Sequence, residues 1–211
     1  MKKKRVKKNG NFSLKQEYYQ SFKYIKESKN FIYAAILIFF IFVAIGFFFQ
    51  DIINLMFKNF LGINLQDQML ELIKRLLEST KDMSQKELIG YIFFNNVQSS
   101  FYAVFFGILF GIMPLFSSIT NGYLLGFVAL ISVKAQGFLV LWKVLPHGIF
   151  ELPALFISLG LGFKLGTYFF IKKKKSFFLC ILNSLKIFLL IILPLLIIAA
   201  IIEGTLILFL S

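Results

Sequence analysis

The sequence has a single histidine, His147, four residues before an acid, Glu151, in the segment WKVLPHGIFELPALF. Side chains four residues apart lie on the same face of a helix, so the imidazole and the carboxylate would be neighbours. Two prolines, Pro146 and Pro153, flank the pair, and mostly apolar residues follow. An ionisable pair in such surroundings can act as a buried hydrogen-bonded clamp, bind an ion or form part of a proton pathway.

The elements that would hold this pair are long apolar segments. The chain of 211 residues is 58% hydrophobic, with a mean hydropathy of +0.80, which excludes an ordinary soluble domain. A transmembrane helix needs about 20 apolar residues. Apolar runs that approach this length are Phe31–Phe49, Phe93–Phe116, Tyr123–Val133, Gly148–Ile171 and Ile187–Ile202, of which the third is short. The sequence therefore predicts an all-α membrane protein, a bundle of about five transmembrane helices with a short helical extramembrane segment between the first two.

The formal net charge of +13 is compatible with a nucleic-acid or a membrane partner. The basic residues lie beside the apolar runs and form no RNA-binding or DNA-binding motif. Lysines in such positions mark the cytoplasmic side of a membrane and contact anionic lipid headgroups. We therefore expect the lipid bilayer as a partner and no nucleic acid.

The orientation follows from two basic clusters, one in residues 1–29 and the other at Lys172–Lys175. If both clusters lie inside, an even number of spans separates them. This supports five crossings of the cell membrane with an inner turn at Ser117–Asn121, the N-terminus cytoplasmic and the C-terminus outside. The chain then divides into a basic cytoplasmic tail with an interfacial helix (1–29), a first transmembrane helix (30–50), an outer helical segment (51–90) and a four-helix membrane bundle (91–211).

The outer segment carries an amphipathic helix over residues 66–80, because Met69, Ile73, Leu76 and Thr80 recur at helical spacing. We expect this helix to pack on the outer face of the bundle. Lying on the lipid surface and docking a partner are the alternatives. The string SQKE, from Ser84 to Glu87, predicts a capping box that starts the next helix.

This topology brings polar residues from three predicted spans to the outer leaflet. Nitrogen and oxygen ligands for a divalent metal could come from His147, Glu151 and Glu203, although one histidine with two acids is a sparse set for structural zinc. No HExxH motif or Ser–His pairing is present, so we expect no enzymatic activity and no cofactor, with a divalent metal as the alternative. The full polar cluster is Asn95, Asn96, His147, Glu151 and Glu203.

Small residues recur every fourth position in three successive spans. Such ridges let transmembrane helices approach closely. The predicted helix-packing residues are Gly107, Gly111, Gly122, Gly126, Ser158, Gly162 and Gly166.

Four strings resemble the stage II sporulation protein M family of integral membrane proteins. They are FFNNVQSSFYAVFFGILFGIMPLF, NGYLLG, LPHGIFELPALFISLGLGFKLG and PLLIIAAIIEG, and they cover Phe93 to Gly204. The family positions include Asn96, Asn121, Gly122, Pro146, His147, Gly148, Glu151, Pro153 and Glu203.

The resemblance implies a non-enzymatic protein with about five spans, similar to a scaffold that localises membrane-anchored peptidoglycan-degrading partners. The predicted function is thus a scaffold that recruits membrane or cell-envelope proteins, with a homo-oligomer as one form of assembly. The alternative is a transporter or channel subunit with an ion or metal site in the outer leaflet.

Overall fold

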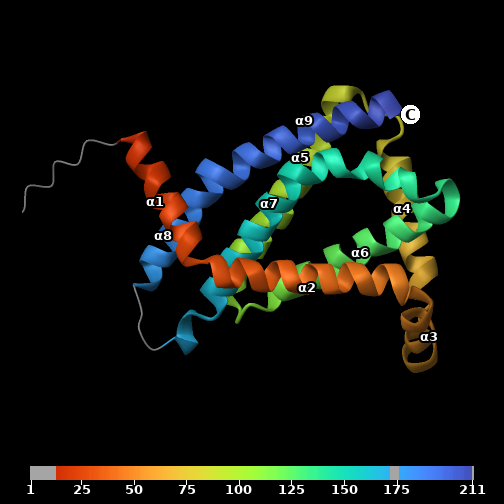
Figure 1. Cartoon of the computed structure of the whole chain (residues 1–211), viewed down its shortest axis with the longest axis horizontal. Coiled ribbons are helices and arrows are strands. Elements are labelled where there is room, and N and C mark those ends of the chain that lie inside the picture. The colour runs from red at the N-terminus through yellow and green to blue at the C-terminus, as the bar shows by residue number, and fades with distance from the viewer. Residues whose placement is uncertain (1–12, 172–175, 211) are drawn as a thin grey trace, which may run out of the picture.

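The computed structural model of the chain describes residues 13–171 and 176–210, without the side chains of 142–147 and 208–210. All regular structure in these ranges is helical, which confirms the predicted fold class (Figure 1). The helices are α1 (Leu14–Glu27), α2 (Lys29–Phe48), α3 (Gln50–Leu61), α4 (Leu65–Thr80), α5 (Gln85–Phe105), α6 (Ile112–Gln136), α7 (Leu141–Gly166), α8 (Phe177–Ile187) and α9 (Leu193–Leu210).

Four helical stretches among the described residues are long and apolar enough to cross a membrane. The α2 helix alone has 20 residues and is about 30 Å long, which matches the hydrocarbon core of a bilayer. The α5 helix packs beside them but is less apolar, because Asn95, Asn96, Gln98 and two serines interrupt it. The four stretches are Lys29–Phe48, Ile112–Gln136, Gly148–Gly166 and Phe177–Ile207.

The two ends of the bundle differ in the helices and charged side chains that lie there. Helices α1 and α8 lie at one end, together with Lys164 and Lys186, and we call this the basic end (Figure 1). Helices α3 and α4 lie at the other, together with the start of α5 and the end of α9, and we call this the arm end. The α5 and α7 helices run from the arm end to the basic end, whereas α2, α6 and α9 run the opposite way.

Close helix contacts occur where glycine replaces a side chain. The parallel helices α2 and α6 touch through Gly46, Gly122 and Gly126, and a Cβ atom on any of them would clash with the backbone of the other helix. The central helix α7 approaches α5 and the turn after it in the same way, with Gly162 against the Ala103 carbonyl of α5 and against Gly107 of the turn. Backbone contact of this kind supplies the packing that holds helices together in lipid.

The boundary between the second and third predicted spans is wrong. The expected turn at Ser117–Asn121 lies inside α6, and the chain turns instead at residues 106–111. Phe110 (φ 54°) and Gly111 (φ 76°) both have left-handed backbone conformations, which end the preceding helical segment. Pro114 then lies in the first turn of α6, where its missing N–H is not needed. The apolar side chains on both sides of the turn hid it in the hydropathy pattern.

Prolines also shape the two C-terminal spans. The α7 helix begins at Leu141, five residues before Pro146, so Pro146 lies within the helix and not in its first turn. The helix continues through Pro153, which leaves the Ile149 carbonyl without its usual helical donor. Before Pro194, the chain forms a wider π-helix over Phe188–Ile192, which relieves the clash between the proline ring and the Leu190 carbonyl.

Candidate functional site

The structure brings two of the predicted polar residues together at the arm end. Glu151 is on α7 and Glu203 is on α9, and both residues are half-buried. The two carboxyl groups are close enough to interact electrostatically. The α9 helix is fixed there against α5, because Gly204 packs on Ile89 and Gln85 Nε2 donates a hydrogen bond to Thr205 Oγ1 at 3.3 Å. The two acids therefore lie near each other where α7 and α9 meet at the arm end.

The other predicted members of the cluster differ in position. Asn95 is exposed on α5 and Asn96 is half-buried, and no described side-chain hydrogen bond joins either to an acid. The backbone of His147 belongs to α7, but its side chain lies outside the described residues. Among the described side chains, no group of three histidines, cysteines or acids is arranged to hold a metal ion. The metal set proposed from the sequence includes His147, so the described residues do not test it.

The family positions on α6 and α7 differ in their surroundings. Asn121 Nδ2 donates to Ser117 O at 2.8 Å and to Ser117 Oγ at 3.0 Å, so its amide stays bonded within α6. Gly122 lies against the Phe39 carbonyl of α2. Pro153 is exposed on the outer surface of α7, and Gly148 is half-buried one turn earlier.

Helices α3 and α4 form a hairpin outside the candidate spans, and we call it the arm. Gly62 ends α3 in a left-handed conformation (φ 67°), and Asn64 caps α4 by accepting the Asp67 N–H at 3.3 Å. The Asn54 side chain of α3 also accepts the Gln66 N–H at 3.1 Å. Polar residues thus fix the angle between the two helices.

The arm exposes a large apolar surface. No residue of α4 is buried, so the expectation that this helix packs on the bundle is wrong. Its contacts are mainly with α3, and the hairpin lies at the arm end of the bundle (Figure 1). Phe60 is 82% exposed and Leu77 is 66% exposed. The arm patch consists of Ile52, Leu55, Met56, Phe60 and Leu61 of α3 and Leu70, Leu72, Leu76 and Leu77 of α4.

A second polar cluster, at the basic end, was missed by the sequence reasoning. Lys164 of α7 donates a hydrogen bond from Nζ to Ser28 Oγ at 2.8 Å and lies 3.5 Å above the centre of the Tyr24 ring. Burial raises the pKa of the Tyr24 phenol, and the neighbouring Cys180 thiol adds to the rise. The signal in the sequence was Lys164 itself, a lysine within the apolar run Gly148–Ile171.

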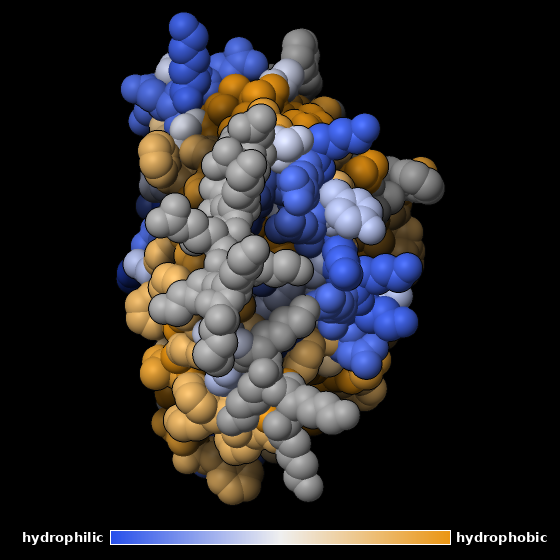
Figure 2. Space-filling model, turned by 90° about the vertical axis from the view of Figure 1, so that its left-hand side faces the viewer, coloured by the Kyte–Doolittle hydropathy of each residue, from blue (hydrophilic) through white to orange (hydrophobic). Residues whose placement is uncertain are grey.

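An ion pair also joins α1 to α8, since Lys186 Nζ lies 2.6 Å from Glu17 Oε2. Figure 2 looks onto this end and shows hydrophilic side chains beside a broad hydrophobic surface. The predicted inner cluster Lys172–Lys175 lies outside the described residues. The segments on both sides of it, ending at Ile171 and starting at Ser176, belong to the basic end.

Comparisons with known proteins identify the family. The family model of Stage II sporulation protein M matches residues 35–206. An uncharacterized protein of Methanocaldococcus jannaschii is 39% identical over 104 residues, which are 46% of this chain and 47% of that protein, so the chain spans about half the length of this curated relative. No solved structure matches. Because the family match covers most of the sequence, the chain belongs to the Stage II sporulation protein M family and is a multi-pass membrane protein.

Proposed function

We propose that this member of the Stage II sporulation protein M family is a non-enzymatic scaffold that recruits partner proteins at the cell membrane through the arm patch. The observation that carries the proposal is the set of exposed apolar side chains on α3 and α4, which lie outside the membrane-crossing helices. Exposed apolar surface on a membrane-crossing helix faces lipid. On an amphipathic hairpin outside the spans, exposed apolar surface instead indicates a binding site for another molecule.

The shape of the arm supports a protein partner. Its apolar residues lie on two helices held at a defined angle by Asn54 and Asn64. A preformed surface of this kind loses little conformational entropy when a second protein binds. Charged residues, among them Lys74 and Glu78, flank the leucines and provide the polar rim typical of interfaces. The partner expected is a membrane or cell-envelope protein, and a second copy of this chain is the homo-oligomeric form of the same proposal.

The orientation proposed places the N-terminus in the cytoplasm and the arm and C-terminus outside. It is supported by the lysines of α1, α7 and α8 at the basic end, together with the sequence clusters of residues 1–29 and Lys172–Lys175. Acidic and basic residues of the arm nearly balance, as is usual on the outer side.

Within this proposal, Glu151 and Glu203 lie where α7 meets α9 and carry no chemistry. The competing role is an ion or metal site in a transporter or channel subunit. Two measurements separate these roles: metal analysis of the purified protein, and solute or ion flux in proteoliposomes. The scaffold predicts no stoichiometric divalent metal and no flux that Glu151→Gln abolishes. A bound metal lost on that substitution, or a flux that it removes, would establish the ion site instead.

Partner recruitment is tested by capture from native membranes in mild detergent. Leu70→Gln/Leu77→Gln removes two exposed leucines seven residues apart on α4, whereas Lys74→Gln/Lys81→Gln changes two exposed lysines with the same spacing. The leucine variant should lose a defined partner or the homo-oligomer by about tenfold or more, because central apolar contacts carry most binding energy. The lysine variant should retain it. A wild-type protein that is strictly monomeric and without partner contradicts the proposal.

A further inference from the structure

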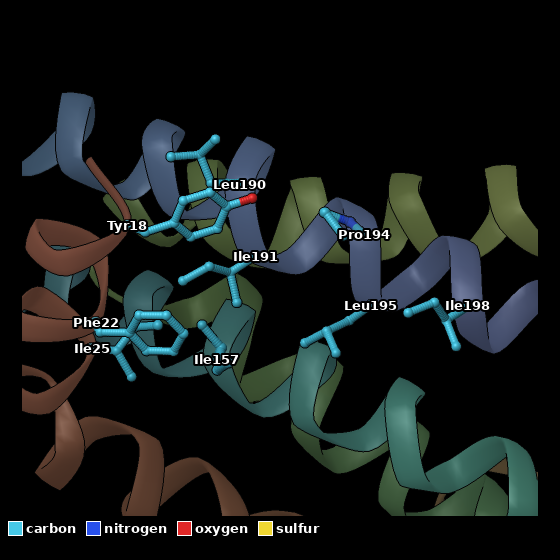
Figure 3. Close-up of a pocket in the computed structure, with 9 residues that line it drawn as sticks. All are labelled: Tyr18, Phe22, Ile25, Ile157, Leu190, Ile191, Pro194, Leu195 and Ile198. Atoms are coloured by element: carbon cyan, nitrogen blue, oxygen red, sulfur yellow. The ribbon is translucent and has the colours of Figure 1, made fainter. Parts of the chain in front are cut away.

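An apolar groove of about 440 Å³ lies at the basic end, between α1 and the membrane-crossing helices (Figure 3). One wall is the face of α1 that carries Tyr18, Phe22 and Ile25, at helical spacing. The opposite wall comes from Ile157 of α7 and from the segment around Pro194. The volume of the groove is in the range of sites that bind small molecules.

A π-helix forms part of the groove wall. It precedes Pro194, which lacks an N–H group, and it displaces Leu190 and Ile191 from the positions they would take in an α-helix. These two residues and Pro194 line the groove, followed by Leu195 and Ile198 toward its inner end. The widened turn therefore forms part of the wall that faces α1.

The chemistry of the lining matches a hydrocarbon chain. Ile157 and Ile198 belong to helices that cross the membrane, so this end of the groove is at hydrocarbon depth. At the other end lies Tyr18 of the amphipathic helix α1, whose phenol oxygen is the one polar side-chain atom among the residues that line the groove. Tyrosine in this position marks the level of the lipid headgroups.

Positive charge surrounds the headgroup end. Lys15 is one turn before Tyr18 on α1, Lys26 is one turn after Phe22, and both are exposed. Lys186 is one turn before Leu190 and pairs with Glu17. Each lysine near a membrane surface attracts anionic lipid.

We propose that the groove binds one acyl chain of an anionic phospholipid, whose negatively charged headgroup is attracted by the exposed lysines of α1, Lys15 and Lys26. Bound in this way, the lipid fills the space between α1 and the π-helix and fixes α1 at the membrane surface. The proposal concerns the basic end and is independent of partner binding at the arm.

The test is native mass spectrometry of the full chain, purified in detergent and supplied with phosphatidylglycerol or phosphatidylcholine. Ile198→Trp fills the groove, whereas Ile197→Trp adds the same side chain at the adjacent, equally exposed position outside it. The wild type and Ile197→Trp should each retain one phosphatidylglycerol through delipidation, and Ile198→Trp should retain about tenfold less. Equal retention by the two tryptophan variants would overturn the proposal.

The headgroup contact has its own variant, which leaves the groove wall intact. Lys15→Gln/Lys26→Gln should reduce retention of phosphatidylglycerol to the level of phosphatidylcholine, while Lys58→Gln on the arm should leave it unchanged. Two results overturn the proposal: a wild type that retains neither lipid, and a dimer mass that Ile198→Trp abolishes, because the groove would then hold a second copy of the chain.

Discussion

The amino group of Lys164, in the last turns of α7, donates a hydrogen bond to Ser28 Oγ at the junction of α1 and α2. Ser28 Oγ in turn donates to the Tyr24 carbonyl at 2.7 Å, and the lysine covers the Tyr24 ring. A single cation thus connects the central helix of the bundle to the helix that lies across its basic end.

Lys164→Met should destabilise the protein, because it removes a charged hydrogen bond and a cation–π contact from a half-buried site. We expect a loss of about 1–2 kcal/mol, seen as a lower unfolding temperature in detergent. Lys23→Met, at an exposed position on α1, is the control and should change stability little. Equal unfolding temperatures for the two variants would show that the Lys164 contact contributes nothing.

Gly162→Ala tests the close contact between α5 and α7. Its methyl group would collide with the Ala103 carbonyl, which belongs to a helix backbone and cannot move without moving α5. We expect destabilisation of about 1–3 kcal/mol. Gly90→Ala on α5 meets no atom within 4 Å and should stabilise that helix by about 0.5–1 kcal/mol. The unfolding temperature should therefore fall for Gly162→Ala and rise for Gly90→Ala. An unchanged unfolding temperature for Gly162→Ala would be inconsistent with this packing.

The start of α5 should depend on pH. Glu87 accepts hydrogen bonds from Ser84 Oγ at 2.7 Å and from the Ser84 N–H at 2.8 Å, which lower the pKa of its carboxyl below the usual 4.5. Because the folded pKa is depressed, this stabilisation is complete above about pH 4.5 and is lost as the pH falls through the folded value. Hydrogen-exchange protection of the first turn should decrease in that window. Glu87→Gln should remove the dependence, and protection that stays constant in the wild type argues against the cap.

Membrane topology can be tested with single cysteines in a Cys180→Ser background, since the native cysteine is buried. Gln68→Cys on the arm should react with an impermeant maleimide in intact cells. Ser13→Cys, before α1, should react only after lysis. Labelling of both positions in intact cells would invalidate the proposed orientation and, with it, an arm that meets cell-envelope partners.

Much of the fold could be predicted from the sequence. Hydropathy identified an all-α membrane protein, the four family strings identified the family that the comparisons confirm, and SQKE identified the cap of α5. These features are local, since each depends on residues close together in the chain.

The errors have a common physical origin. Hydropathy cannot locate a turn between two equally apolar segments, so Gly111 in its left-handed conformation was not recognised as the helix boundary. It also cannot show whether Leu77 on an amphipathic helix faces its own bundle or stays exposed. Lys164 was overlooked because its partner, Ser28, is distant in the sequence and has no feature that marks it.

The claim on which the proposed function depends most is that the arm patch contacts a protein. Photo-crosslinking from position 77 in native membranes tests it directly, with position 75, exposed on the opposite side of the same helix, as the control. The scaffold predicts one polypeptide cross-linked from position 77, absent from position 75 and lost when Leu70 is changed to Gln. Adducts to lipid alone from position 77 would contradict it, since the arm would then lie on the membrane surface.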